Sequence, residues 1–269
     1  MDWIEALFLG IIQGLTEFLP VSSSGHLEIA KALLGLKGTE SLTFTIAVHG
    51  ATTLSIIVVF WKDIKKLFKE FFAFKWNKET QYIFKILISM LPVGIIGLLF
   101  KEKIKALFTG DIVFVGYMLI ITAILLGFTF FAKPKNKNIS FFHAFIIGIS
   151  QAIAVIPGIS RSGATISTGL LLGNKKKEIA KFSFLMVVIP IIGENVLDLI
   201  SGEMTKGATV GNIPLLIGFL AAFISGLLAC KWMLKIVKNG KLIYFAIYCL
   251  IIGLIIIIFC NRSQYIFYN

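Results

Sequence analysis

The sequence predicts an all-α polytopic membrane protein built as an inverted-topology repeat, with one re-entrant helical hairpin and three transmembrane helices in each half. Three observations predict this fold class. First, 57% of the 269 residues are hydrophobic, the mean hydropathy is +0.91 and only 15% are charged, where a soluble domain has about 25% charged residues. Second, six apolar runs are long enough to cross a bilayer. Third, a polar motif that interrupts the apolar sequence occurs twice.

The first repeat covers residues 1–133. Its apolar segment 4–36 is interrupted by the polar turn Pro-Val-Ser-Ser-Ser-Gly at 20–25, so we expect two short helices joined in a re-entrant hairpin. Three runs of about 18 to 21 residues follow, a length that suits a hydrocarbon core of about 30 Å. These predicted spans are 44–61, 82–100 and 112–132. Segment 62–81 carries six lysines among aromatic residues, which is typical of an amphipathic helix on the membrane surface.

The second repeat covers residues 139–261 and has the same order of elements. Its apolar segment 141–173 is interrupted by Pro-Gly-Ile-Ser-Arg-Ser-Gly at 157–163, which predicts a second re-entrant hairpin. The predicted spans that follow are 182–200, 213–234 and 242–260. We therefore expect the whole chain, 1–269, to form a single integral membrane domain.

The two predicted hairpins share a pattern that indicates a duplication. Gly-Ile-x-Gln followed by Ser-x-Ser-Gly occurs at 10–13 and 22–25, and again 138 residues later at 148–151 and 160–163. Because a re-entrant hairpin returns to its own side, the three spans between the copies place the second hairpin on the opposite face of the membrane. The two polar turns then enter from opposite sides and can meet near the midplane.

The positive charge of the chain predicts its topology. The formal net charge is +12, and the 24 lysines and two arginines cluster between the apolar runs. This pattern is typical of loops beside an anionic lipid surface, so we expect membrane lipids and no nucleic acid as partners. Eighteen basic residues flank one side of the predicted membrane domain and seven flank the other. By the positive-inside rule the richer side is cytoplasmic, and both termini lie outside.

Arg161 is the one basic residue that belongs to neither side. An arginine within the membrane costs about 2.5 to 3.5 kcal/mol on insertion scales unless it is paired or hydrated. It could snorkel to a loop, but its place between two serines of a duplicated turn favours a function. The planar guanidinium presents parallel donors that match phosphate oxygens, which a lysine does not reproduce.

The first turn carries complementary polar groups. Gln13 and Glu17 are four residues apart and share one helix face. A helix N-cap accounts for one of the three serines 22–24, but not for all of them, nor for His26. The helices that begin at both turns direct backbone N–H groups at one point, so we predict an anion site between the turns. We interpret His49, in the first span, as a packing residue, with a role in lining the site as the alternative.

Segments 13–26 and 157–165 resemble the two signature motifs of the undecaprenyl-diphosphate phosphatase family, also called bacitracin-resistance proteins. The residues that carry the resemblance are Gln13, Glu17, Phe18, Leu19, Pro20, Val21, Ser22, Ser23, Ser24, Gly25 and His26, then Pro157, Gly158, Ile159, Ser160, Arg161, Ser162, Gly163, Ala164 and Thr165. The likeness extends over essentially the whole chain in motif order, length and number of apolar runs. The family pattern admits Glu or Gln at position 13, but an amide such as that of Gln13 cannot act as an anionic metal ligand.

The resemblance implies an enzyme that hydrolyses undecaprenyl diphosphate, a polyprenyl diphosphate lipid, to undecaprenyl phosphate and inorganic phosphate at the outer side of the bacterial inner membrane. Such an enzyme recycles the lipid carrier for peptidoglycan synthesis and confers bacitracin resistance. A second class of function stays open, because inverted repeats with midplane polar residues are also typical of secondary transporters. A transporter or a lipid-carrier flippase could use the same anion site. A homodimer also stays open.

The resemblance also implies roles for individual residues. It favours Ser23 as the nucleophile, while spacing alone leaves Ser22, Ser24 and His26 as alternatives, and His26 is otherwise the expected general base or acid. Arg161 would clamp the phosphoryl oxygens, and Glu17 would hold a divalent cation, Mg²⁺ or Ca²⁺. The residues expected to bind the head group are Gln13, Ser22, Ser24, Gly25, Ser160, Ser162, Gly163 and Thr165.

Overall fold

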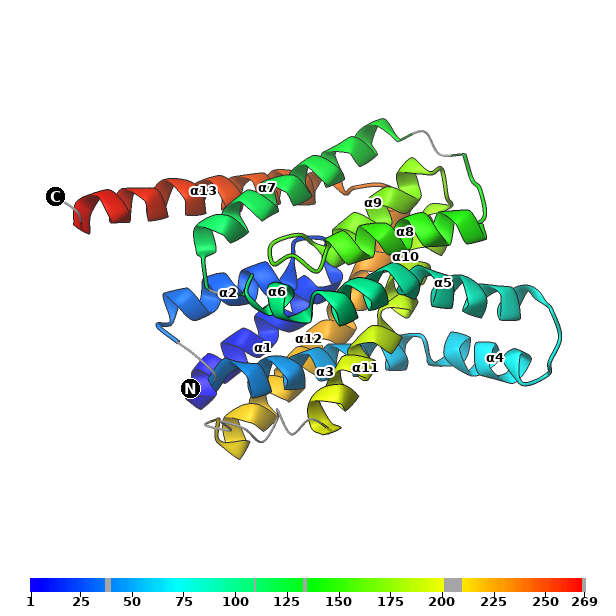
Figure 1. Ribbon diagram of the computed structural model, residues 1–269, viewed down its shortest axis with the longest axis horizontal. Coiled ribbons are helices and arrows are strands. Elements are labelled where there is room, and N and C mark those ends of the chain that lie inside the picture. The colour runs from blue at the N-terminus through cyan, green and yellow to red at the C-terminus, as the bar shows by residue number, and fades with distance from the viewer. Residues whose placement is uncertain (37–39, 109, 133–134, 201–209, 268–269) are drawn as a thin grey trace.

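The computed structural model describes residues 1–36, 40–108, 110–132, 135–200 and 210–267, and the regular structure in these ranges is helical (Figure 1). The helices are α1 Trp3–Phe18, α2 Ser23–Leu33, α3 Glu40–Val59, α4 Trp61–Phe71, α5 Lys78–Leu99, α6 Lys101–Lys105, α7 Ile112–Phe128, the 3₁₀ helix η1 Thr129–Phe131, α8 Phe141–Ile153, α9 Arg161–Leu171, α10 Lys176–Met186, α11 Val188–Ile200, α12 Asn212–Asn239 and α13 Ile243–Phe267. The predicted all-α class is therefore confirmed.

Several stretches are long and apolar enough to cross a membrane. Four of them are α5, the combined α7 and η1 stretch Ile112–Phe131, α12, and the part Ile243–Cys260 of α13. Thr43–Val59 of α3 and α4 count as a fifth only if this pair is taken as one span, and the two helices are bent by 76° relative to each other. The chain is therefore a multi-pass membrane protein.

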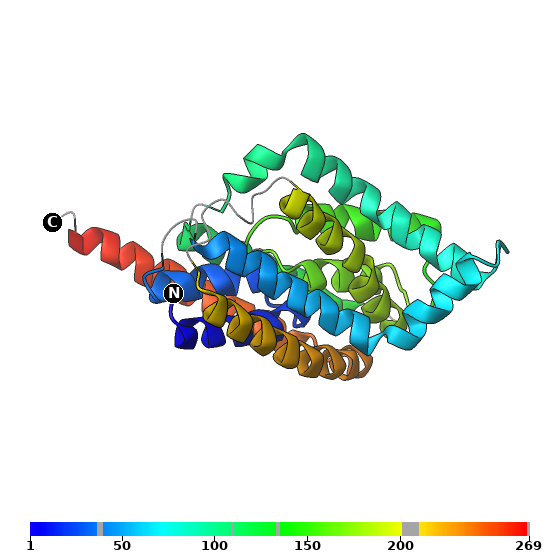
Figure 2. The ribbon, with the colours of Figure 1, turned by 90° about the horizontal axis from the view of Figure 1, so that it is seen from below.

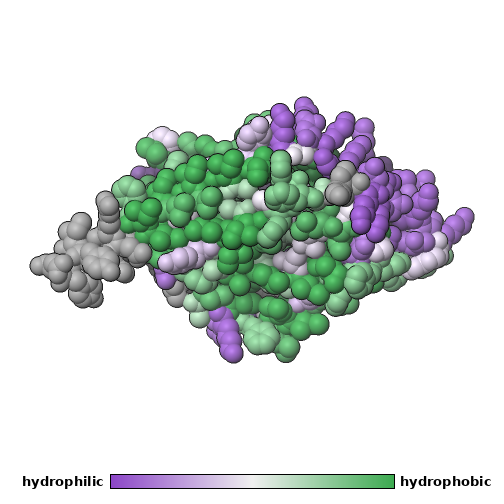
Figure 3. Space-filling model, turned by 90° about the horizontal axis from the view of Figure 1, so that it is seen from above, coloured by the Kyte–Doolittle hydropathy of each residue, from purple (hydrophilic) through white to green (hydrophobic). Residues whose placement is uncertain are grey.

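The helix α4 lies on the surface at one end of the molecule. None of its side chains is buried, and Lys66 Nζ on α4 donates a 2.6 Å hydrogen bond to Glu79 Oε1 at the start of α5. Hydrophilic side chains gather at this end, whereas most of the remaining visible face is apolar (Figure 3). Segment 62–81, predicted as one amphipathic helix, thus consists of α4, a turn and the first residues of α5.

The predicted continuous span 182–200 is two helices in the structure, α10 and α11, which meet at Val187. The break has a local cause. Pro190 has no N–H for the carbonyl group of Met186, four residues earlier, and its ring would clash with that carbonyl in a continuous helix. The α10 helix is a core element, since Phe182, Phe184 and Met186 are almost completely buried.

Glycines let the long helices approach closely, as is common where membrane helices pack. A Cβ atom added at Gly14 of α1 would lie 1.9 Å from Ser225 Oγ and 2.5 Å from the Ala222 carbonyl oxygen of α12. A Cβ atom added at Gly148 of α8 would lie 2.3 Å from the Ser89 carbonyl oxygen of α5. The hairpin helices α1 and α8 are therefore held against α12 and α5 at positions where only glycine fits.

We expect Gly14→Ala to destabilise the protein by about 1 to 3 kcal/mol, because the added methyl group overpacks the contact of α1 with α12. Gly94→Ala on α5 is the matched control, since a Cβ there would have no neighbour within 4 Å, and alanine favours the helix. Thermal unfolding of the purified variants in detergent measures both effects. Equal unfolding temperatures for the two variants would contradict the close contact.

Candidate active site

The two hairpin turns lie against each other. Ser162 Oγ, at the start of α9, donates a 3.2 Å hydrogen bond to the Leu19 carbonyl oxygen in the first turn. A Cβ atom added at Gly25 would lie 3.1 Å from the Cα atom of Gly158, and one added at Gly163 would lie 3.4 Å from the Cβ atom of Pro20. The small residues of the duplicated pattern therefore allow the two backbones to meet.

In the first turn two of the three serines build the start of α2. Ser22 Oγ accepts a 3.2 Å hydrogen bond from the Gly25 N–H, and it lies 3.3 Å from Ser24 Oγ. Ser22 has a φ of 71°, in the left-handed region that costs a non-glycine residue about 1 to 3 kcal/mol and that is common at functional sites. The hydroxyl of Ser23 takes no part in this cap.

The second turn repeats this arrangement at the start of α9. Ser160 Oγ accepts a 3.0 Å hydrogen bond from the Gly163 N–H and lies 3.3 Å from Ser162 Oγ. The Ser160 N–H in turn donates to Thr122 Oγ1 of α7 at 3.0 Å. Arg161 holds the position that corresponds to Ser23, so the middle residue of each triplet is left to project from its turn.

Glu17 is the residue on which the two turns converge. It is only 6% exposed, and its Oε2 accepts hydrogen bonds from Ser23 Oγ at 2.6 Å and from Gln13 Nε2 at 3.0 Å. Arg161 Nη2 pairs with the other carboxylate oxygen, Oε1. A buried carboxylate needs such partners. Ser23 and Arg161 thus share one carboxylate, although they come from different hairpins.

His26 is hydrogen-bonded to Ser22 and Tyr248 rather than to Ser23. Its Nδ1 lies 2.8 Å from the Ser22 carbonyl oxygen, and its Nε2 lies 2.8 Å from the Tyr248 hydroxyl of α13. Both ring nitrogens are therefore engaged with groups other than the expected nucleophile. The Ser23 hydroxyl has Glu17 as its acceptor instead.

Thr165 lies behind the second turn rather than at its surface. It is fully buried, and its hydroxyl is 2.6 Å from Ser183 Oγ and donates to the Arg161 carbonyl oxygen at 2.9 Å. Ser160 and Ser162 are also buried. The structure thus shows these three residues holding the turn that presents Arg161.

Two residues near the site were not among the predicted site residues. His49 Nε2 of α3 lies 4.0 Å from Glu17 Oε2, which favours the alternative interpretation, a role in lining the site, over packing alone. Tyr248 lies within hydrogen-bond distance of His26, although the two residues are 222 positions apart in the sequence. His49 is a polar residue in an apolar run, and this pattern could have identified it as a site residue. The sequence around Tyr248 has no feature that predicts a role in the site.

The oxygen atoms around Glu17 suit a hard divalent cation. Gln13 Oε1 is buried and has no hydrogen-bond partner, next to the Glu17 carboxylate that Gln13 Nε2 contacts. Mg²⁺ and Ca²⁺ prefer carboxylate and amide oxygens of this kind. Within the described ranges there is no group of three or more His, Cys, Asp or Glu side chains that could hold a metal ion. Glu17 and Gln13 would therefore need further oxygen ligands, such as those of a phosphate.

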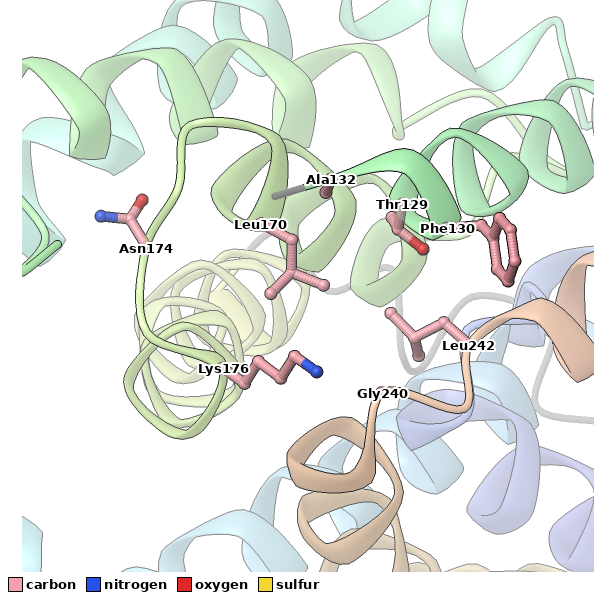
Figure 4. A pocket seen from close by; sticks show the side chains of 8 residues that line it. All are labelled: Thr129, Phe130, Ala132, Leu170, Asn174, Lys176, Gly240 and Leu242. Atoms are coloured by element: carbon pink, nitrogen blue, oxygen red, sulfur yellow. The ribbon is translucent and has the colours of Figure 1, made fainter. Parts of the chain in front are cut away.

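A pocket of about 230 Å³ lies away from these residues. It is lined by Thr129, Phe130, Ala132, Leu170, Asn174, Lys176, Gly240 and Leu242 (Figure 4). Lys176 extends toward Gly240, where a Cβ atom would lie 2.6 Å from Nζ (Figure 4). An ammonium group at the C-terminal end of α12 is a favourable helix-end contact. The pocket contains none of the predicted site residues.

Comparisons with known proteins agree with the resemblance of the two motifs. The family model described as bacitracin resistance protein BacA matches residues 6–255. An undecaprenyl-diphosphatase of Bacteroides fragilis (strain YCH46) is 58% identical over 263 residues, covering 96% of this chain and 98% of the relative. An undecaprenyl-diphosphatase of Bacteroides thetaiotaomicron is 57% identical, with 96% and 99% covered. A more distant one, of Halothermothrix orenii, is 39% identical with 96% and 98% covered.

Proposed function

The chain belongs to the bacitracin resistance protein BacA family, and from this premise we propose that it is an integral membrane phosphatase that converts undecaprenyl diphosphate into undecaprenyl phosphate and inorganic phosphate. The observation that carries the proposal is the convergence of Ser23 and Arg161 on Glu17. A hydroxyl with a carboxylate acceptor, beside a guanidinium, supplies what phosphoryl transfer from a diphosphate needs. The product is the lipid carrier for peptidoglycan synthesis, which links the activity to bacitracin resistance.

In the first half of the proposed reaction Ser23 Oγ attacks the terminal phosphorus. The bond from Oγ to phosphorus forms, the bond from phosphorus to the bridging oxygen breaks, and undecaprenyl phosphate leaves. Glu17 Oε2 accepts the proton of Ser23, because it already accepts the hydrogen bond of that hydroxyl at 2.6 Å. Glu17 therefore takes the role of base that the sequence assigned to His26.

Arg161 couples substrate binding to this step. Before substrate binds, its guanidinium neutralises Glu17. A diphosphate carries more negative charge than a carboxylate and offers paired oxygens, so it competes for the guanidinium. When Arg161 turns to the phosphate, its guanidinium no longer neutralises Glu17, which favours transfer of the Ser23 proton to Oε2. Arg161 also neutralises charge that develops in the transition state.

In the second half, water attacks the phosphoserine. The bond from phosphorus to Ser23 Oγ breaks, inorganic phosphate leaves, and Glu17 returns its proton to Oγ. His26 is three residues after Ser23 and so shares its helix face, which makes it the proposed acceptor of the water proton. Gln13 Oε1 and the Glu17 oxygen that Arg161 releases, Oε1, would hold Mg²⁺ or Ca²⁺ together with substrate oxygens, while Oε2 exchanges the Ser23 proton. The bound cation would neutralise diphosphate charge.

We also propose the inverted topology, with both termini outside the cytoplasm of a bacterial inner membrane and the site open to the outer face. The first residues and the end of α13 lie at the end of the molecule opposite the lysine-rich α4 (Figures 1 and 2), which supports this orientation. In a cysteine-free background, Lys103→Cys in α6 should react with an impermeant maleimide on intact cells. Lys69→Cys in α4 should react only after permeabilisation.

Phosphate release by the purified protein in detergent tests the proposed function. We expect one inorganic phosphate and one undecaprenyl phosphate for each undecaprenyl diphosphate consumed. Detergent removes every transmembrane gradient, so a transporter or flippase would leave the lipid intact. Intact lipid after incubation with folded protein would contradict the phosphatase. Light scattering of the same sample measures whether the chain forms a homodimer.

Chelation tests the proposed cation. Treatment with EDTA is expected to reduce turnover by about tenfold or more, and Mg²⁺ or Ca²⁺ should restore it, because the bound cation offsets diphosphate charge. Turnover of the wild-type protein and its unfolding temperature are measured before and after chelation, so that loss of fold is distinguished from loss of the cation. Full turnover after exhaustive chelation would show that the reaction does not need a divalent cation.

A further inference from the structure

The Tyr248 hydroxyl of α13 joins the site through His26 of α2. Tyr248 Oη lies 2.8 Å from His26 Nε2, and the two rings are stacked, with centroids 5.6 Å apart and an interplanar angle of 12°. The Tyr248 side chain as a whole is 40% exposed, on a helix long and apolar enough to cross a membrane. The contact therefore ties a tyrosine hydroxyl to the imidazole three residues after the proposed nucleophile.

The partners of His26 determine which ring nitrogen carries the proton. The Ser22 carbonyl oxygen can only accept, so Nδ1, 2.8 Å away, is the N–H donor. In the neutral ring Nε2 is then the acceptor, and the Tyr248 hydroxyl donates to it. Since both nitrogens are occupied, a water molecule reaches the basic nitrogen of His26 only through the oxygen of Tyr248.

We propose that the Tyr248 hydroxyl relays the proton of the hydrolytic water to His26, an inference that rests on the proposed reaction through Ser23. The water oxygen bonds to phosphorus as the bond to Ser23 Oγ breaks. The proton of the water passes to the Tyr248 oxygen while the tyrosine proton passes to His26 Nε2. Tyr248 gives up one proton and receives one, so it ends the step unchanged as a hydroxyl. Glu17 returns its proton to Oγ, and the His26 imidazolium releases its extra proton to solvent.

The neighbouring Tyr244 supplies a matched control. It lies one turn earlier on α13 and is 65% exposed, and within the described ranges it has no hydrogen-bond partner. Tyr248→Phe and Tyr244→Phe each remove one hydroxyl from the same helix and leave the ring in place. A general effect of altering α13 would appear in both variants, whereas loss of the relay appears only in Tyr248→Phe.

Rapid-quench kinetics with terminally ³²P-labelled undecaprenyl diphosphate tests the relay. In Tyr248→Phe we expect kcat to fall by about tenfold or more with KM nearly unchanged, and acid-stable phosphoserine to accumulate, because only the second half of the reaction loses its proton transfer. Tyr244→Phe should match the wild-type protein. A Tyr248→Phe enzyme that turns over normally, or one that slows without accumulating phosphoserine, would overturn the relay.

Two further measurements separate the relay from a packing role. The loss in the double variant His26→Gln with Tyr248→Phe should equal that of His26→Gln alone, since both residues serve one transfer. Turnover in mixtures of light and heavy water should depend on two protons in flight for the wild type and on fewer for Tyr248→Phe. Additive losses or identical isotope dependence would contradict the relay. If the wild-type protein itself releases no phosphate, the proposed function fails instead.

Discussion

Replacing Ser23 with alanine is expected to reduce phosphate release by a factor on the order of 10⁴, because the hydroxyl whose proton goes to Glu17 is the proposed nucleophile. Glu17 keeps Arg161 and Gln13 as partners, so the loss of one hydrogen bond should change the free energy of unfolding by only about 1 kcal/mol. Turnover and thermal unfolding of the same preparation measure both quantities.

Ser22→Ala separates the nucleophile from its neighbour. Ser22 caps α2 through the Gly25 N–H, so this variant should lose about 1 kcal/mol of stability and still form phosphoserine. Acid-quenched protein from ³²P-labelled substrate should carry label in Ser22→Ala and none in Ser23→Ala. Normal turnover by Ser23→Ala would contradict Ser23 as the nucleophile and leave Ser22, Ser24 or His26 as candidates.

Arg161→Lys is expected to reduce kcat/KM by about 10²- to 10³-fold although it keeps the positive charge. A lysine ammonium does not present the two parallel donors with which a guanidinium holds phosphate oxygens, and loss of a preorganised donor to developing charge has effects of about this size. The lysine can still pair with Glu17, so the unfolding temperature should change little. Near-normal turnover by Arg161→Lys would contradict the proposed role of the guanidinium in holding the phosphate oxygens.

Arg161→Ala is the informative comparison for stability. It leaves the buried Glu17 carboxylate without its cationic partner, and breaking a buried pair in this way costs about 3 to 5 kcal/mol. We therefore expect Arg161→Ala to lose both activity and fold stability, whereas Arg161→Lys loses activity alone. Equal stability of the two variants would show that the pair with Glu17 does not support the fold.

Several polar residues of the site could be predicted from the sequence because an apolar background makes them conspicuous. Glu17, Ser23 and Arg161 interrupt apolar segments in two copies of one pattern, and polar groups within a membrane are costly unless they have a use. Glycines of the same pattern, such as Gly25 and Gly163, proved to be contact points between the two turns. Duplication and hydropathy are properties of the sequence itself, so they can be recognised without the tertiary structure.

Other features depend on contacts between distant segments. Tyr248 is separated from His26 by 222 residues, and a tyrosine in an apolar helix carries no sign of its partner. For His49 the sequence left packing and lining the site as alternatives, and its distance to Glu17 shows only in the structure. The break of the predicted span 182–200 at Val187 was also missed, because a proline within a membrane helix is often tolerated, and the burial of α10 in the core shows only in the assembled structure.

The sequence by itself determined the membrane class, the two polar turns and the family resemblance, because composition, periodicity and repeated motifs are properties of the chain alone. Only the tertiary structure decided that Glu17 accepts the Ser23 hydrogen bond while His26 is bound to Tyr248. A hydrogen bond depends on distances of a few tenths of an ångström. Those distances are set by how α1, α2, α9 and α13 pack, through glycine contacts that lie far apart in the sequence.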